Sequence, residues 1–148
     1  MKKLSLLFSL VIMFVAGCSI DSSQSEGANA PIPVEETVTM GNLDITVESF
    51  ENQGKWNGER IVTIKVSAKI THDKDTGLRA EYFSLVDAEG TRYYPDLSKS
   101  QIWNPPLSPE PHGQIYFELP RDTRSLAVAI TNNPLNRNAE YQTVTLMY

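Results

Sequence analysis

The chain has 148 residues, which is enough for one folded domain but short for two. Its 18 acidic residues outnumber its 13 basic ones, and like-charge repulsion makes nucleic acid and other phosphate polymers poor partners. With only one cysteine there can be no intrachain disulfide, so an apolar core has to stabilise the fold.

The first 17 residues have the order of an export signal. Lys2 and Lys3 give a positive start, an apolar run extends from Leu4 to Val15, and the small residues Ala16 and Gly17 follow. The run has 12 residues, two of them serine, whereas a helix needs about 20 apolar residues to span a membrane. We therefore expect residues 1–17 to be a cleaved signal peptide.

The four residues Val15-Ala16-Gly17-Cys18 resemble the lipobox of bacterial lipoproteins. In that family the signal is cut just before the cysteine, and the cysteine sulfur carries a diacylglyceryl group. The resemblance implies cleavage between Gly17 and Cys18 and lipidation of Cys18. Two acyl chains give stable attachment, since each buried CH₂ contributes about 0.8 kcal/mol. The prediction is a protein held on the extracytoplasmic face of the cell membrane; the alternative is an ordinary secretory site with an unmodified Cys18.

Residues 18–35 are polar and small, without an apolar period. Such a composition cannot bury enough surface to offset the entropy lost on ordering, so we expect a flexible tether. A tether of this length keeps a domain within roughly 20 to 25 Å of the membrane. Without the signal, 11 basic residues remain against 18 acidic ones, a net charge of −7.

From Val38 onward, apolar residues recur at every second position, which is typical of strands with one buried face. The residues 87–90 predict a hairpin turn in which Gly90 takes a positive φ. Seven to eight antiparallel strands in residues 36–148 predict an all-β, immunoglobulin-like sandwich. The apolar members of the clearest runs are Leu43, Ile45 and Val47; Val62, Ile64, Val66, Ala68 and Ile70; Ile115, Phe117 and Leu119; Leu126, Val128 and Ile130; Val144, Leu146 and Tyr148.

Two stretches interrupt the alternation and are expected to be irregular loops. Residues 51–59 contain Trp56, and residues 95–113 contain Trp103 and His112 among prolines that fix φ and lack an N–H donor. An exposed Trp103 could stack on a sugar or anchor a protein partner. The preferred alternative is that Trp103 folds back over the open end of the sandwich. Nearby Tyr94 is a further binding candidate, and Tyr116 is expected on the outer face.

The pattern Phe83-x-Leu85-x-Asp87-x-x-Gly90-x-x-Tyr93, followed by Gly113-x-Ile115-x-Phe117-x-Leu119-Pro120, resembles a telokin-like, immunoglobulin-like domain of secreted bacterial surface antigens. The resemblance covers roughly residues 38–130. These motifs are structural, so the resemblance implies a fold and almost nothing about activity. Thr71-His72 and Pro109-Glu110-Pro111 depart from the family pattern, which bears on the loops more than on the sandwich.

The sequence has no recognisable nucleophile, phosphate, dinucleotide or zinc-protease motif, so we expect no enzyme and no cofactor. A Ser-His-Asp site assembled in space, using His72 or His112, stays open. Asp73 and Asp75 are weak calcium candidates. An EF-hand would need glycine and a bidentate acid where Leu78 and Ser84 stand, so an Asx turn is the simpler interpretation.

These features together predict a lipid-anchored, non-catalytic surface module. It would bind an envelope protein or glycan through the Trp56 and 95–113 loops. The alternatives are a calcium-dependent or hydrolytic accessory protein and a structural envelope spacer. The sequence does not predict an oligomeric state.

Overall fold

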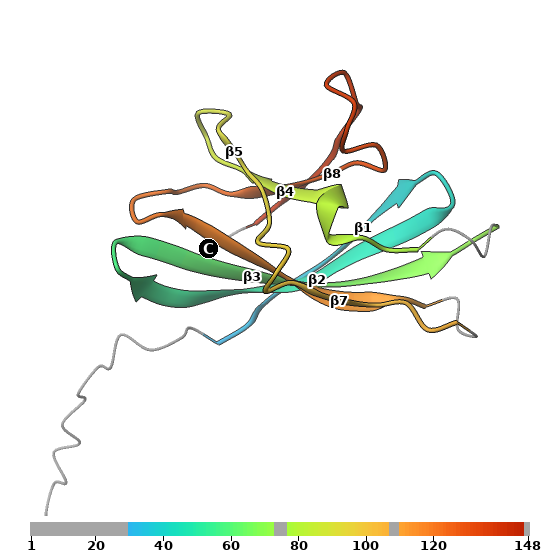
Figure 1. Ribbon diagram of the computed structural model, residues 1–148, viewed down its shortest axis with the longest axis horizontal. Helices are drawn as coiled ribbons and strands as arrows, with labels where there is room; N and C mark the ends of the chain where they lie inside the picture. Colours follow the sequence, from blue (N-terminus) through green and yellow to red (C-terminus); the bar gives the residue numbers. More distant parts are fainter. Residues whose placement is uncertain (1–29, 73–76, 107–109, 147–148) are drawn as a thin grey trace, which may run out of the picture.

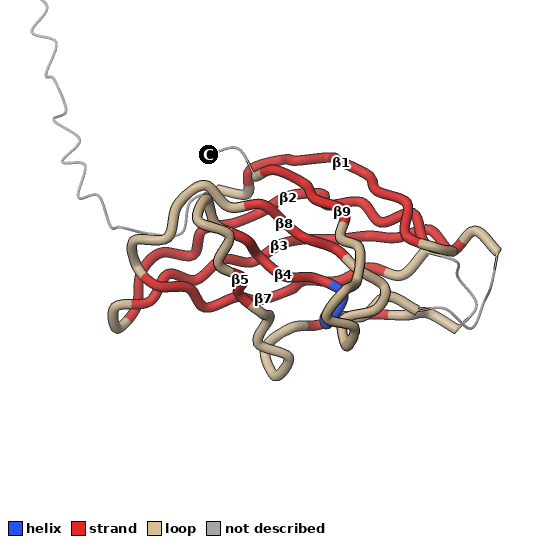
Figure 2. The backbone as a smooth tube through the Cα atoms, turned by 90° about the horizontal axis from the view of Figure 1, so that it is seen from above, coloured by secondary structure: helices blue, strands red, loops and turns tan. Residues whose placement is uncertain are grey.

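The alternating segments form two antiparallel sheets that pack face to face as a β-sandwich (Figure 1). The structure, a computed structural model, describes residues 30–72, 77–106 and 110–146, and within them the side chains of Lys55 and Trp56 are not described. In the view from above, the strands of both layers run along the long axis of the molecule, as in an aligned sandwich (Figure 2). The predicted all-β sandwich is confirmed, with nine strands in the described residues.

The larger sheet has the strand order β1-β2-β3-β7-β6 and the smaller sheet the order β5-β4-β8-β9. A 3₁₀ turn, η1 (Ala80–Tyr82), precedes β4. Among the described residues, no helix has the length and apolar character needed to cross a membrane. The strand bounds are β1 Ile32–Met40, β2 Leu43–Trp56, β3 Glu59–Ile70, β4 Phe83–Val86, β5 Arg92–Tyr93, β6 Gln101–Trp103, β7 His112–Pro120, β8 Ala127–Ile130 and β9 Gln142–Thr145.

The core lies between the sheets, and most of the apolar positions that the alternation predicted are buried in it. Phe50 and Leu78, which the alternation did not predict, are buried there too, whereas Ile70 is only partly buried and Tyr148 lies outside the described residues. In β7, Ile115, Phe117 and Leu119 are buried, and Tyr116 lies half-buried between them, which confirms its expected place on the outer face. Burying large side chains fully stabilises the fold by about 1.5–3 kcal/mol each. The largest fully buried side chains are Phe50, Phe83, Phe117, Leu43, Ile45, Ile64, Leu78, Leu85, Ile115, Leu119, Leu126 and Ile130.

β2 is longer than expected and contains two register shifts against β3. One lies between Val47 and Ser49, and the other between Asn52 and Lys55. The irregular loop expected at residues 51–59 is wrong in this part, because Gly54 adopts φ 90° within the strand and accommodates the second irregularity. Residues 51–59 are therefore the end of a long hairpin with a turn at Asn57-Gly58, rather than an irregular loop.

The stretch 95–113 is also more regular than predicted. β6 lies within it, and β7 begins at His112. The prolines at 95 and 105 flank β6 without occupying it, so its N–H donors remain available for pairing with β7. At the N-terminal side, β1 starts at Ile32, so residues 32–35, which were expected in the tether, belong to a strand.

The predicted hairpin at residues 87–90 is confirmed. The Gly90 N–H donates to the Asp87 carbonyl at 3.1 Å, and Gly90 has φ 84°. The Asp87 carboxylate accepts hydrogen bonds from the Thr91 N–H at 2.7 Å and the Tyr93 hydroxyl at 2.9 Å. Partial burial would raise the pKa of Asp87, but the bonds from Tyr93, Thr91 and Glu89 outweigh it and lower that pKa below its ordinary value of 3.8.

Candidate functional site

Trp103 is exposed, although the backbone that carries it is held on both sides. Its side chain is 56% accessible to solvent, so the expectation that it folds back over the sandwich is wrong. β6 pairs with β7 so that Trp103 lies opposite His112, and their ring centroids are 4.7 Å apart in an edge-to-face arrangement. An exposed ring on a paired strand is positioned before any ligand arrives, which lowers the entropy lost on binding.

The residues just before β6 form a tight turn that is tied to β7. The Asp96 N–H donates to the Tyr116 carbonyl at 2.9 Å, and the Tyr116 N–H donates to the Ser100 hydroxyl at 3.0 Å. Lys99 adds an ion pair with Glu118 and lies 4.9 Å from the centre of the Tyr116 ring. The segment predicted as a stiff loop thus owes its order to these hydrogen bonds as well as to its prolines.

The charges of this turn stabilise one another. The hydrogen bond to Glu118 is the main cause that raises the pKa of Lys99 above its ordinary range, and Asp96 contributes further. The Ser98 hydroxyl donates to Asp96 at 2.6 Å and is the main cause that lowers the pKa of the Asp96 carboxyl. The pairs are exposed, so they contribute little to the stability of the whole domain.

Asn104 holds the other side of β6. Its side-chain amide donates to the Leu78 carbonyl at 3.0 Å, and its side-chain oxygen accepts from the Leu78 N–H at 2.9 Å. The two bonds imitate a short strand pairing and join β6 to the segment that precedes η1. The backbone at Trp103 is therefore held on one side by pairing with β7 and on the other by the two hydrogen bonds between Asn104 and Leu78.

Gly113 permits the close approach of β6 to β7. A Cβ at this position would lie 2.4 Å from the Gln101 carbonyl oxygen and 2.5 Å from the Ile102 Cδ1. Gly113 is not among the glycines with positive φ, so the requirement is one of space and not of backbone conformation. Any larger residue would push β6, and with it Trp103, away from the sheet.

The outer face of the larger sheet presents two rows of side chains beside Trp103. Cross-strand pairing places Lys65, Gln114 and Gln101 in one row, and Ser67, His112 and Trp103 in the next. Directly paired side chains have Cβ atoms about 4.5–5.5 Å apart, so each row forms a continuous polar surface. The face combines a cation, two amides, an imidazole and an indole within reach of one ligand.

Glu48 joins this surface because of the first bulge in β2. The register passes from Val47 opposite Val66 to Ser49 opposite Lys65, which leaves Glu48 without a cross-strand partner. Bulges re-aim a side chain, and they are frequent beside functional sites. Here the bulge also resets the alternation so that Phe50 faces the core.

These residues line a shallow groove across the sheet. One recess of about 540 Å³ is lined by Glu48, Lys65, Gln101, Trp103, His112 and Gln114, and Gly113 also lines it. A second recess of about 570 Å³ is lined by hydroxyl and charged residues of β1, β2 and β3, and it shares Glu48 and His112 with the first. The two recesses together form one groove, named here the Trp103 groove.

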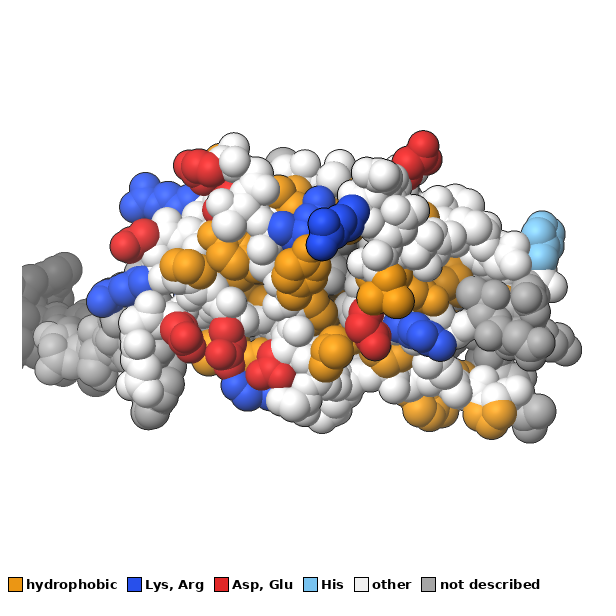
Figure 3. Space-filling view, turned by 45° about the horizontal axis from the view of Figure 1, so that its top comes forward, with side chains coloured by type: hydrophobic (Ala, Val, Ile, Leu, Met, Phe, Trp, Pro, Cys, Tyr) orange, Lys and Arg blue, Asp and Glu red, His pale blue; other side chains and the backbone are white. Residues whose placement is uncertain are grey.

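Figure 3 shows another side of the molecule. On the side shown in Figure 3, acidic, basic and hydrophobic side chains are interspersed. Tyr94 is 69% exposed but does not line the Trp103 groove. It therefore stays outside the site to which the sequence analysis assigned it.

The two predicted binding loops do not form one surface. Trp56 pairs with Glu59 at one end of β3, whereas Trp103 is linked through His112 to Ser67. Glu59 and Ser67 are eight residues apart, which corresponds to roughly 27 Å along a strand. The structure brings Trp103 and His112 together and separates both from Trp56.

Other predicted residues lie outside the described part of the chain. Gly17, Cys18, Asp73 and Asp75 belong to this group. Within the described residues, no group of three or more His, Cys, Asp or Glu side chains could hold a metal ion. His72 is exposed and lies beyond the end of β3.

Sequence reasoning missed Glu48, Lys65, Gln101, Gln114 and Asn104. Lys65, Gln101 and Gln114 are polar residues at exposed strand positions, where nothing in the alternation separates a binding residue from a merely solvated one. The bulge at Glu48 could have been noticed, because the apolar spacing changes from two to three between Val47 and Phe50.

Comparison with known proteins supports the fold and the family. A solved structure described as that of a functionally unknown protein from Listeria monocytogenes EGD-e matches with a TM-score of 0.53 and 12% identity over 82% of each chain. At this identity the similarity shows the fold alone. No curated protein matches the chain. Residues 32–140 match the model of a family described as a domain of unknown function, DUF4352. The chain belongs to the DUF4352 family.

Proposed function

We propose that the protein is a lipid-anchored, extracytoplasmic and non-catalytic module that binds a glycan of the cell envelope in the Trp103 groove. One observation carries this proposal. Trp103 is 56% exposed at the groove, and its backbone is fixed by β7 on one side and Asn104 on the other. A large apolar ring held in water by the fold, beside polar groups, is well suited to a ligand that is itself part apolar and part polar.

The chemistry of the groove fits a sugar chain. The C–H face of a sugar ring can stack on an indole, while its hydroxyls need both donors and acceptors around them. The amides of Gln101 and Gln114 provide both, Glu48 accepts, and Lys65 donates. Because the second recess continues across β1, β2 and β3, the groove has room for successive units of a linear chain.

A protein partner fits the groove less well. The centre of a protein interface is usually depleted of charged residues, and its contacts bury an apolar cluster. Here Glu48, Lys65 and the adjoining Asp44 and Lys69 line the surface on both sides. Such charges would have to lose their hydration without an apolar core around them, which is costly unless the partner pairs each of them.

The lipid anchor in this proposal is supported by the signal-like N-terminus and the lipobox-like residues before Cys18. It would confine the domain to a thin layer beside the membrane, where an envelope glycan is also present. The absence of a catalytic motif supports a binding role. Asp44, Glu48 and Glu110 line one recess, so glycan hydrolysis is the second candidate for the same groove.

Cosedimentation with insoluble cell-envelope glycan tests the proposal. Trp103→Ala should weaken binding by about tenfold or more, as expected for an aromatic residue at the centre of a site. Tyr94→Ala is the matched control, because it removes another exposed aromatic ring that lies outside the groove. Equal binding by the Trp103→Ala and unchanged chains would refute the site. New reducing ends released from the glycan would show hydrolysis instead.

A further inference from the structure

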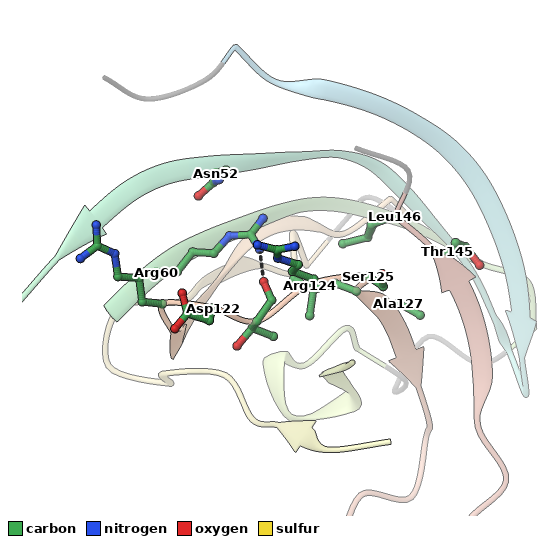
Figure 4. A pocket seen from close by; sticks show the side chains of 11 residues that line it. Asn52, Arg60, Asp122, Arg124, Ser125, Ala127, Thr145 and Leu146 are labelled. Atoms are coloured by element: carbon green, nitrogen blue, oxygen red, sulfur yellow. Dashed lines mark hydrogen bonds between the residues drawn. The ribbon is translucent and has the colours of Figure 1, made fainter. Parts of the chain in front are cut away.

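A cationic recess, separate from the Trp103 groove, is drawn in Figure 4. It has a volume of about 830 Å³ and lies between the start of β3 and the turn that joins β7 to β8. Arg60 pairs with Leu119, whereas Gly113 marks the groove at the other end of β7, roughly 20 Å away along the strand. The two sites are therefore independent. The lining residues are Asn52, Arg60, Arg121, Asp122, Thr123, Arg124, Ser125, Leu126, Ala127, Thr145 and Leu146.

Three arginines line this recess against a single acidic side chain, that of Asp122. Arg121 and Arg124 are exposed and form no ion pair within the described residues. Guanidinium groups match the oxygens of phosphate and carboxylate, and they often bind them through two parallel hydrogen bonds. The recess is thus a local site of positive charge on an acidic protein.

The turn that carries Arg121 and Arg124 is fixed in place. Arg60 is only 5% exposed, and its Nη1 donates to the Thr123 carbonyl at 2.6 Å. The Thr123 hydroxyl and N–H both donate to the Pro120 carbonyl, at 2.8 and 3.1 Å. In Figure 4, Arg60 and Arg124 extend toward the same part of the recess. Because the turn is held before binding, little entropy is lost when an anion is captured.

The recess lies at the end from which the chain enters the sandwich. β1 is antiparallel to β2, with Ile32 opposite Phe50, so the N-terminal end of β1 lies at the end of the sandwich that carries Asn52 and the β2–β3 turn. Asn52 itself lines the recess, and its Oδ1 is buried without a hydrogen-bond partner among the described residues. With the anchor proposed above, this end of the domain would be the one nearer the membrane.

We propose that this recess binds the phosphate of an anionic phospholipid head group and so orients the domain on the membrane that holds it. The orientation rests on the anchor of the proposed function. The net charge of −7 does not oppose the contact, because charges more than about 8 Å away are largely screened at physiological ionic strength. With the cationic recess bound to the membrane, the Trp103 groove, which lies at the other end of β7, would face away from the membrane and toward the envelope.

The test is a titration of the full chain with water-soluble dihexanoyl phosphatidylglycerol, and separately with inorganic phosphate at equal ionic strength. Binding is followed by the NMR signals of the arginine Nε–H groups. Phosphatidylglycerol should bind, and Arg121→Gln with Arg124→Gln should weaken it by roughly tenfold for each arginine removed. Arg137→Gln, which removes an exposed arginine outside the recess, is the matched control and should bind as the unchanged chain does.

Three results would overturn the proposal. The first is that phosphatidylglycerol does not bind, and the second is that the double substitution leaves its binding unchanged. The third is that inorganic phosphate binds equally tightly, which would assign the recess to the free ion. Every chain in the comparison keeps the same N-terminus, so any lipid contact made by residues 1–17 cancels. The measured affinity for phosphatidylglycerol does not depend on lipidation of Cys18 or on glycan binding at Trp103. Failure of the anchor or of glycan binding would therefore be seen separately, in their own experiments.

Discussion

Replacement of Gly113 by alanine should displace β6 and disable the Trp103 groove. The added Cβ would lie 2.4 Å from the Gln101 carbonyl oxygen, whereas ordinary contacts begin at 3.4 Å, so β6 must move by about 1 Å. Hydrogen bonds of about 2.9 Å across the β6–β7 ladder would then exceed the distance at which they hold. Overpacking of this kind costs about 1–3 kcal/mol in the free energy of unfolding.

The strain introduced by Gly113→Ala should disrupt β6 and leave the rest of the sandwich packed. β6 is a three-residue strand at the edge of its sheet, and it can separate while the buried rows of β2, β3 and β7 stay packed. We therefore expect a moderate loss of stability in urea unfolding, together with a large loss of glycan affinity. With Trp56 replaced by phenylalanine, the fluorescence of Trp103 alone reports the change in its surroundings.

The control for this substitution is Gly90→Ala. Gly90 has φ +84° and open space around it, so alanine there is strained by about 1–2 kcal/mol without a clash near the groove. The two variants should be similarly destabilised, but only Gly113→Ala should lose the glycan. The reasoning is refuted if Gly113→Ala leaves stability and binding unchanged, or if Gly90→Ala loses the glycan to the same degree.

Two further outcomes are expected. A Cys18→Ala chain should lack lipid labelling and accumulate unprocessed or in the medium; normal labelling of that chain would contradict the proposed anchor. Hydrogen bonds lower the pKa of Asp87 in the folded state, so the stability it contributes is present above its ordinary value of 3.8 and disappears as the pH falls through the folded value. Urea titrations should therefore show that the difference in unfolding free energy between the unchanged chain and Asp87→Asn is largest above pH 4 and becomes smaller at more acidic pH. A difference that does not depend on pH would show that the charge of the carboxylate plays no part.

Much of the core could be predicted from the sequence because burial on one face of a strand leaves a period of two. Ile115, Phe117 and Leu119 show this directly, since all three are fully buried as the alternation predicted. The Asp87–Gly90 hairpin was also predictable, because a glycine with positive φ and an aspartate that accepts from the turn are local requirements. Neither feature depends on which strands later become neighbours.

The irregular parts were not predictable in this way. Trp103 was assigned to a loop because β6 has only three residues and lies between prolines, so no alternation can be recognised. Residues 51–59 were assigned to a loop because a glycine at a bulge, such as Gly54, and a glycine in a loop look the same in one sequence. Trp103 is exposed because β7 and Asn104 hold β6, and the contact of Asn104 joins it to Leu78, 26 residues away in the chain.

The sequence by itself therefore determined the strand pattern, the local turns and the expectation of a lipid anchor at Cys18, since each depends on neighbouring residues. Only the tertiary structure decided that Glu48, Lys65 and Trp103 share one face and that Arg60, Arg121 and Arg124 share another. The physical reason is that both surfaces arise from the register between strands. Register depends on bulges, on the close approach allowed by Gly113, and on packing between sheets, and these are contacts between parts of the chain that are far apart in sequence.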